Sequence, residues 1–190
     1  AVPTRVNATF NGMFSKIGAP ESVFGSGRPD DWGFLMINFS SDIEAADLVL
    51  ANNGYNWFSP ASDYTDRYAN YANPYIRFVI FYNQIKRCND IILSIGKNPE
   101  DPTLKSTLGQ ALAVRAFDYL NLASHFQFNY QIAADKPCVP IVTEEQIDFS
   151  NNPRASVQQV YELILSDLNS AIELLEGFER PNKNQINQQV

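Results

Sequence analysis

The feature that most constrains this chain is an apolar pattern that runs from Tyr71 to Phe126 and is broken only between Gly96 and Asp101. In its first part, side chains recur at spacings of four and three residues, the repeat of one face of an α-helix. That row consists of Tyr71, Tyr75, Phe78, Tyr82, Ile85, Asn89 and Ile92. A second row widens the apolar stripe and consists of Phe81, Cys88, Ile91 and Ile95. The second part opens on a cap aspartate followed by Pro102, a proline suited to the first helical position. Because a short link joins the two helices, we expect a central antiparallel pair.

The same repeat predicts three further helices, over about 4–17, 30–51 and 156–177. The second opens on two adjacent aspartates that we expect to cap it, and an Asn-Asn-Gly sequence closes it. The third opens on a Ser-x-x-Gln capping box. The connector over 129–154 is long for a plain loop. A short extended piece over 139–142 is one interpretation, but Pro140 argues against a central strand there. No strand pattern competes elsewhere, so the sequence predicts an all-α fold in one domain, residues 1–190.

Charge and composition exclude several classes of function. The chain has 190 residues, 21 acidic against 14 basic, and no basic run, so we expect no nucleic-acid partner. The longest apolar runs, such as 78–82, are too short to span a bilayer. Cys88 and Cys138 form neither a disulfide framework nor a zinc site, and His125 is the only histidine. We therefore expect no metal and no cofactor.

The sequence also lacks a catalytic constellation. No serine or cysteine lies in a recognisable nucleophile elbow. The adjacent carboxylate pairs at 30–31 and 144–145 cannot face each other across a cleft, as glycoside hydrolysis requires, so we expect cap or solvated surface roles for them. We expect no enzymatic activity.

Two polar side chains lie on otherwise apolar helix faces, Asn89 and Arg115. Buried polar groups need partners, so we interpret both as structural hydrogen-bonding nodes rather than as catalytic residues. The expected partner of Arg115 is a carboxylate such as Asp167 or Asp42.

Aromatic residues make up 13% of the chain, and several gather among polar residues in one loop. Its candidate ligand-binding residues are Tyr55, Asn56, Trp57, Asp63 and Tyr64. A sugar presents an apolar face ringed by hydroxyl groups, which a flat aromatic ring with amide or carboxylate neighbours suits. The alternative is that Trp57 folds back onto the helices as part of the core.

Residues 115–123, Arg-Ala-Phe-Asp-Tyr-Leu-Asn-Leu-Ala, resemble the "RAF-Y-L" helix of the SusD/RagB family, the glycan- and nutrient-binding outer-membrane lipoproteins of Bacteroidetes. Residues 85–92 resemble the family's "I-x-x-x-N-x-I-I" helix. Further motifs follow in the family's order at 139–142, 153–157, 160–161 and 167–175. The resemblance extends over about 71–190.

The resemblance implies antiparallel helix pairs in a tetratricopeptide-like, right-handed superhelical arrangement, with no enzymatic activity. It implies a surface-exposed protein of the outer membrane that captures a glycan for uptake and delivers it to a SusC-like TonB-dependent transporter. Family members are longer, so the chain resembles an N-terminal portion. Its membrane attachment would be a lipid anchor that precedes the residues present. No family motif assigns a ligand contact to a numbered residue. The alternative function is a structural helical-repeat module that binds proteins and no sugar.

Overall fold

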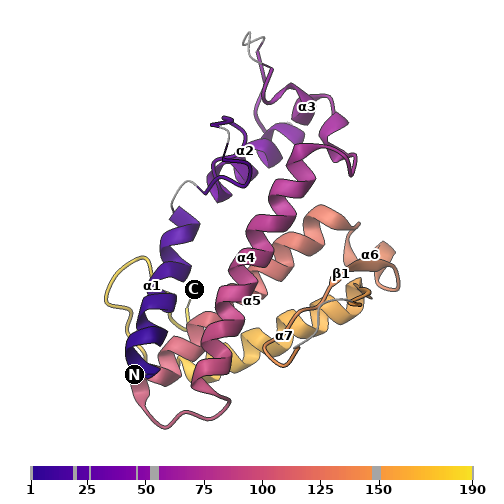
Figure 1. Ribbon diagram of the computed structural model, residues 1–190. Helices are drawn as coiled ribbons and strands as arrows, with labels where there is room; N and C mark the ends of the chain where they lie inside the picture. The colour runs from indigo at the N-terminus through magenta and orange to yellow at the C-terminus, as the bar shows by residue number, and fades with distance from the viewer. Residues whose placement is uncertain are drawn as a thin grey trace. The chain divides into compact units, whose positions relative to one another are not determined.

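A computed structural model describes residues 2–18, 21–25, 27–45, 47–51, 56–146 and 151–189. These residues form, in chain order, α1 (Val2–Gly18), α2 (Phe34–Glu44), α3 (Ser59–Ser62), the 3-10 helix η1 (Thr65–Arg67), α4 (Ala72–Ile95), α5 (Pro102–Phe126), α6 (Tyr130–Ala133), β1 (Pro137–Pro140), β2 (Arg154–Ser156) and α7 (Val157–Leu174) (Figure 1). The chain divides into two compact units, one of residues 1–14 with 83–190 and one of residues 15–82. The predicted all-α class is confirmed.

In the first unit, α5 and α7 lie side by side (Figure 1). They run antiparallel, because Gly109 near the start of α5 faces Leu174 and Leu175 at the end of α7. A Cβ atom on this glycine would come within 2.8 Å of the Leu175 Cγ. Ala111 and Ala116 of α5 are also buried. Small side chains on α5 therefore allow the two helices to approach closely.

The starts of α5 and α7 agree with the sequence prediction. The side chain of Asp101 accepts hydrogen bonds from the backbone amides of Thr103 and Leu104, at 2.8 Å and 3.0 Å. Ser156 and Gln159 form the predicted capping box, in which each side chain accepts the other residue's backbone amide. These bonds satisfy amides that the helices leave without internal partners.

The connector does contain strand residues, and they begin at Pro137, two residues before the extended piece considered at 139–142. Strand β1 pairs with β2 in an antiparallel, two-stranded sheet. Both prolines of β1 are its end residues, so neither removes an amide from the middle of the strand. Beyond the strand, the backbone amide and carbonyl of Val142 both bond the Tyr119 hydroxyl, at 2.7 Å and 2.9 Å.

In the second unit, α2 is shorter than predicted and begins without a side-chain cap, because its N-cap residue is Gly33. Asp31 accepts bonds from the Ser22 hydroxyl and from two backbone amides of the preceding loop instead. Val49, which falls inside the predicted 30–51 helix, lies beyond the end of α2 and is 95% exposed. Asp31 thus holds residues 22–24 and Asp30 pairs with Arg28, so the predicted cap role is wrong.

The N-terminal half of α4 exposes part of the first predicted row and buries Phe81 of the second. Tyr75 and Phe78 are exposed, whereas Ile76 and Phe81 are buried. Phe81 makes an edge-to-face contact with Phe34 of α2, at 6.0 Å between ring centroids. Packing of α2 therefore covers the predicted row that contains Phe81.

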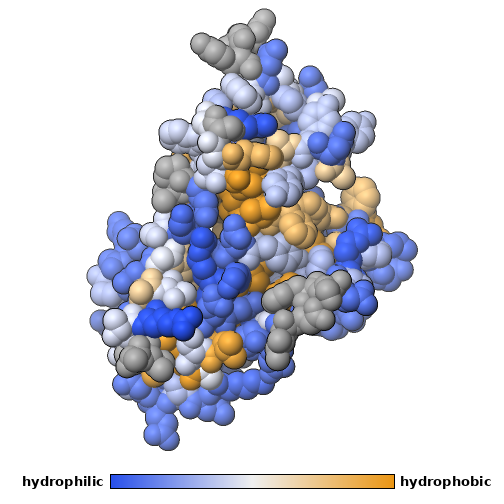
Figure 2. Space-filling view, viewed as in Figure 1, coloured by the Kyte–Doolittle hydropathy of each residue, from blue (hydrophilic) through white to orange (hydrophobic). Residues whose placement is uncertain are grey.

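Apolar side chains remain at the surface of the first unit. Figure 2 shows them over the C-terminal part of α5, where Phe117 and Leu120 are 40% and 42% exposed. Among the described residues, no helix combines the length and apolarity needed to cross a lipid bilayer.

Candidate functional site

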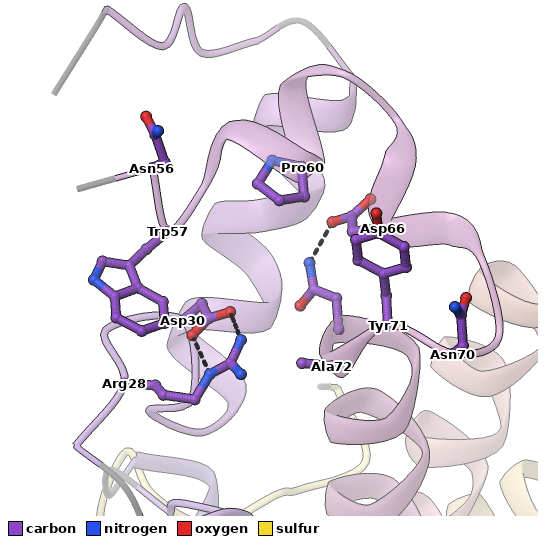
Figure 3. A pocket seen from close by; sticks show the side chains of 10 residues that line it. Arg28, Asp30, Asn56, Trp57, Pro60, Asp66, Asn70, Tyr71 and Ala72 are labelled. Carbon is purple, nitrogen blue, oxygen red and sulfur yellow. Dashed lines mark hydrogen bonds and ion pairs between the residues drawn. The ribbon is translucent and has the colours of Figure 1, made fainter. Parts of the chain in front are cut away.

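The second unit contains a pocket of about 550 Å³ whose wall combines aromatic, amide and charged side chains (Figure 3). The lining residues are Arg28, Asp30, Asn56, Trp57, Pro60, Asp66, Asn70, Tyr71, Ala72 and Asn73. They come from the 28–31 turn, the segment before α3, α3 itself, η1 and the start of α4. The surface around α3 is mostly hydrophilic (Figure 2).

Local backbone geometry brings these segments together. Asn56 and Tyr64, on either side of α3, both have positive φ angles, of 55° and 58°. Such angles are uncommon for residues with a side chain and reverse the chain within one residue. Phe58, the N-cap of α3, makes an edge-to-face contact with Phe39 of α2, at 4.9 Å between ring centroids. The turn is thus fixed against α2, next to the pocket.

One side of the pocket is a stacked group of two rings and a cation. The guanidinium of Arg28 lies 5.2 Å from the ring centre of Trp57 and 5.3 Å from that of Phe24. Its Nε and Nη2 atoms donate to the two carboxylate oxygens of Asp30, at 3.0 Å and 2.7 Å. The hydrogen bond to Asp30 raises the pKa of Arg28. Trp57, which is 37% exposed, is therefore held by a fixed cation.

The other side of the pocket is built around Asp66, which is only 3% exposed. One of its oxygens accepts a hydrogen bond from the side-chain amide of Asn73, drawn in Figure 3. The other oxygen, Oδ1, has no hydrogen-bond partner among the described residues. Burial raises the pKa of this carboxyl, although the bond from Asn73 opposes the shift. Such an oxygen is costly to leave unpaired and favours a ligand or water that can donate to it.

The structure brings only some of the predicted ligand-binding residues together. Asn56 and Trp57 line the pocket. Asp63 and Tyr64 are exposed and do not line it, and the ring of Tyr64 faces the Arg67 guanidinium at 4.4 Å. Tyr55 lies outside the described residues.

Sequence reasoning missed most of the charged wall of the pocket. Arg28 and Asp30 lie 26 or more residues before Trp57, and their spacing suggested a helix cap. Asp66 and Asn73 are seven residues apart around the start of α4. The one available signal was a polar cluster between 63 and 73 that directly precedes the long apolar helix.

A second polar cluster, in the first unit, is centred on Arg115, which is 3% exposed. Its guanidinium donates to both oxygens of Asp167, at 2.7 Å and 2.8 Å. It also donates to Asn89 Oδ1 at 2.8 Å and to Glu144 Oε2 at 2.6 Å. Burial alone would lower the pKa of Arg115, but the bonds and charge of Asp167 outweigh it and raise the pKa.

This cluster joins α4, α5, α7 and the segment after β1. Asn89 extends it by donating to the Val142 carbonyl at 3.0 Å. The solvated surface role expected for Glu144 is wrong, because its side chain is only 15% exposed and pairs with Arg115. Nearby on α5, Asp118 is 2% exposed, and burial raises its pKa well above the ordinary value. Among the described residues, no group of three His, Cys, Asp or Glu side chains is arranged to hold a metal ion.

The chain is similar in sequence to proteins of one known family. A family profile described as "Starch-binding associating with outer membrane", SusD-like, matches residues 36–185. A SusD-like protein of Formosa agariphila is 34% identical over 130 residues, which is 64% of this chain and 23% of that protein. The chain therefore spans about a quarter of the length of this relative.

Solved structures share the fold. A SusD-like carbohydrate-binding protein from Bacteroides vulgatus superposes with a TM-score of 0.82 at 25% identity, over 98% of this chain and 38% of that one. A laminarin-binding SusD-like protein superposes with a TM-score of 0.67 at 21% identity, over 97% of this chain and 37% of that one. With the profile covering most of its length, the chain belongs to the SusD-like family.

Proposed function

We propose that the protein binds a glycan at the outer membrane, through the pocket lined by Trp57. The observation that carries this proposal is an aromatic wall next to amide and carboxylate groups, in a chain of a starch-binding family. A SusD-like structural neighbour that binds laminarin adds support. Ligand sites of this kind combine an apolar wall with a few polar groups that fix orientation.

Each wall of the pocket has a distinct task in this proposal. The exposed part of the Trp57 indole stacks on the apolar face of a sugar ring. Asn56 and Asn73 offer amide groups, and Asp66 offers a carboxyl oxygen, to ring hydroxyls. Asp63 and Tyr64 contact the adjoining units of a longer chain. The protein binds and does not catalyse.

We also propose that the whole protein is lipid-anchored and exposed at the cell surface, where it delivers the glycan to a SusC-like TonB-dependent transporter. Family membership and the outer-membrane association in the family's description support this proposal. Solubilised outer membranes of the source cell provide the test. An affinity-tagged full-length protein should retain a TonB-dependent transporter, and failure to retain one would contradict delivery.

The glycan site is tested by Trp57→Ala in the full-length protein, with calorimetry against starch and laminarin. We expect the loss of one stacked ring to weaken binding about fivefold, which corresponds to about 1 kcal/mol. Trp32→Ala is the matched control, because Trp32 is also exposed, at 53%, and does not line the pocket. Equal affinities for the two variants would remove Trp57 from the site. A fall in melting temperature without a change in affinity would make Trp57 a core residue.

The alternative, a helical module that binds proteins, rests on the exposed face of α7. Leu165, Leu168 and Ile172 follow a helical spacing and are 58%, 38% and 46% exposed. This alternative would be favoured if the wild type binds no glycan and the Leu165→Glu variant no longer binds a protein partner that the wild type binds.

A further inference from the structure

Among the described residues that line the pocket, the one cation is Arg28. Its guanidinium already contacts a carboxylate and two aromatic rings. Among the described lining residues, the charged ones are Arg28, Asp30 and Asp66. Asp30 is 6% exposed and takes two N–H groups of Arg28 in a side-by-side pairing. The guanidinium carbon also lies over the rings of Trp57 and Phe24, at 5.2 Å and 5.3 Å from the ring centres. Figure 3 shows the Arg28–Asp30 pair next to the indole.

The consequence is a pocket without surplus positive charge. The carboxylate of Asp30 cancels the charge of Arg28, and Asp66 adds either nothing, when protonated, or a negative charge. The described lining residues therefore sum to zero or to a negative value. An anionic group entering the pocket would lose hydration without gaining a free cation. The hydroxyl groups of an uncharged sugar meet no such cost and can bond the remaining N–H groups of Arg28 and the free oxygen of Asp66.

We infer that the pocket selects uncharged saccharides over uronate-containing or sulfated ones, and that the Arg28–Asp30 pair determines this selectivity. The inference rests on the proposed glycan-binding function and names the class of glycan. In this arrangement Arg28 is a positioning residue for Trp57, and Asp30 prevents it from acting as an anion receptor. Removing the negative charge of Asp30 frees a cation that is already stacked in the pocket wall.

The test uses the full-length protein, in calorimetry at low and high salt. The uncharged probes are starch and laminarin, and the anionic probes are polygalacturonate, alginate and carrageenan. We expect the wild type to bind an uncharged probe and to bind the anionic probes at least tenfold more weakly. Asp30→Asn should gain affinity for anionic probes by about tenfold at low salt. High salt should abolish this gain, because the freed charge is partly exposed.

Asp135→Asn is the matched control. It removes the same charge and frees a cation, Lys136, whose partner lies at 3.1 Å, but neither residue lines the pocket. It should produce no gain for anionic probes. Asp66→Asn is the second pocket variant, for use if Asp30→Asn does not fold, and it should also raise anionic affinity.

Three outcomes would overturn the inference. Preferential binding of an anionic probe by the wild type would refute the selectivity and leave the proposed function standing. A folded Asp30→Asn that discriminates as the wild type does would refute the role of the Arg28–Asp30 pair, and if Asp30→Asn does not fold, the same result from Asp66→Asn would refute the role of the pocket charges. A wild type that binds neither class of probe would refute the proposed function and this inference with it.

Discussion

Replacing Arg115 with methionine should destabilise the protein by about 3–5 kcal/mol, the usual loss when one partner of a buried ion pair is removed. The contacts of Arg115 explain why this loss of stability exceeds that of most single substitutions. Four hydrogen bonds are lost, and both oxygens of Asp167, a side chain only 5% exposed, are left buried without their donors. Each unsatisfied buried group costs about 1–3 kcal/mol. Glu144 can turn to water and adds little.

The assay is urea unfolding of the wild type and variants, followed by circular dichroism, with the midpoint compared at constant slope. The double variant Arg115→Met/Asp167→Leu should be more stable than Arg115→Met, because removing both charges leaves no buried ion. Lys97→Met is the control. It breaks an exposed pair of similar length, 2.7 Å to Glu145, and should leave the midpoint unchanged. The reasoning is refuted if Arg115→Met costs less than about 1 kcal/mol, or if the double variant gains nothing over it.

Substitutions at three further positions test single features of the first unit. Gly109→Ala should lower stability by about 1–2 kcal/mol in urea unfolding, because overpacking against Leu175 outweighs the gain in helix propensity. Ser156→Ala should cost about 1 kcal/mol by removing half of the capping box, and Ser156→Asp should retain most of the stability. Asp118→Asn should raise the melting temperature by an amount that grows with pH above 3.8, because the raised pKa of Asp118 means that wild-type stability is lost as pH rises. A constant difference across pH would contradict a protonated Asp118.

The sequence predicted the long helices well because their signals are local. Asp101 followed by proline, and Ser156 with Gln159, specify helix starts from side chains within one turn. The sequence predicted two apolar rows on α4, but not which of them is buried in the N-terminal half, because that depends on where α2 packs. The same holds for the two-stranded sheet, whose strands are short and 13 residues apart.

The candidate site was predictable only in its local part. Aromatic and amide residues adjacent in sequence pointed to Asn56 and Trp57. The Arg28–Asp30 ion pair of the pocket precedes Trp57 in the chain, with helix α2 between them. A single sequence does not indicate that residues so far apart in the chain lie next to each other in the fold. Periodicity reports which face of a helix is apolar, but not which loops converge at its end.

The bonds between Tyr119 and Val142 limit how far another strand could pair along β1. A two-stranded sheet has two open edges, and an open edge is a template on which another chain can pair. Just beyond β1, the amide and carbonyl of Val142 would extend such an edge, but the phenol hydroxyl of a buried tyrosine occupies both. The side chain of Asn89 takes the same carbonyl as a second donor. The Tyr119 hydroxyl thus forms the hydrogen bonds that a neighbouring strand would form with Val142, so these two groups are not available to another chain.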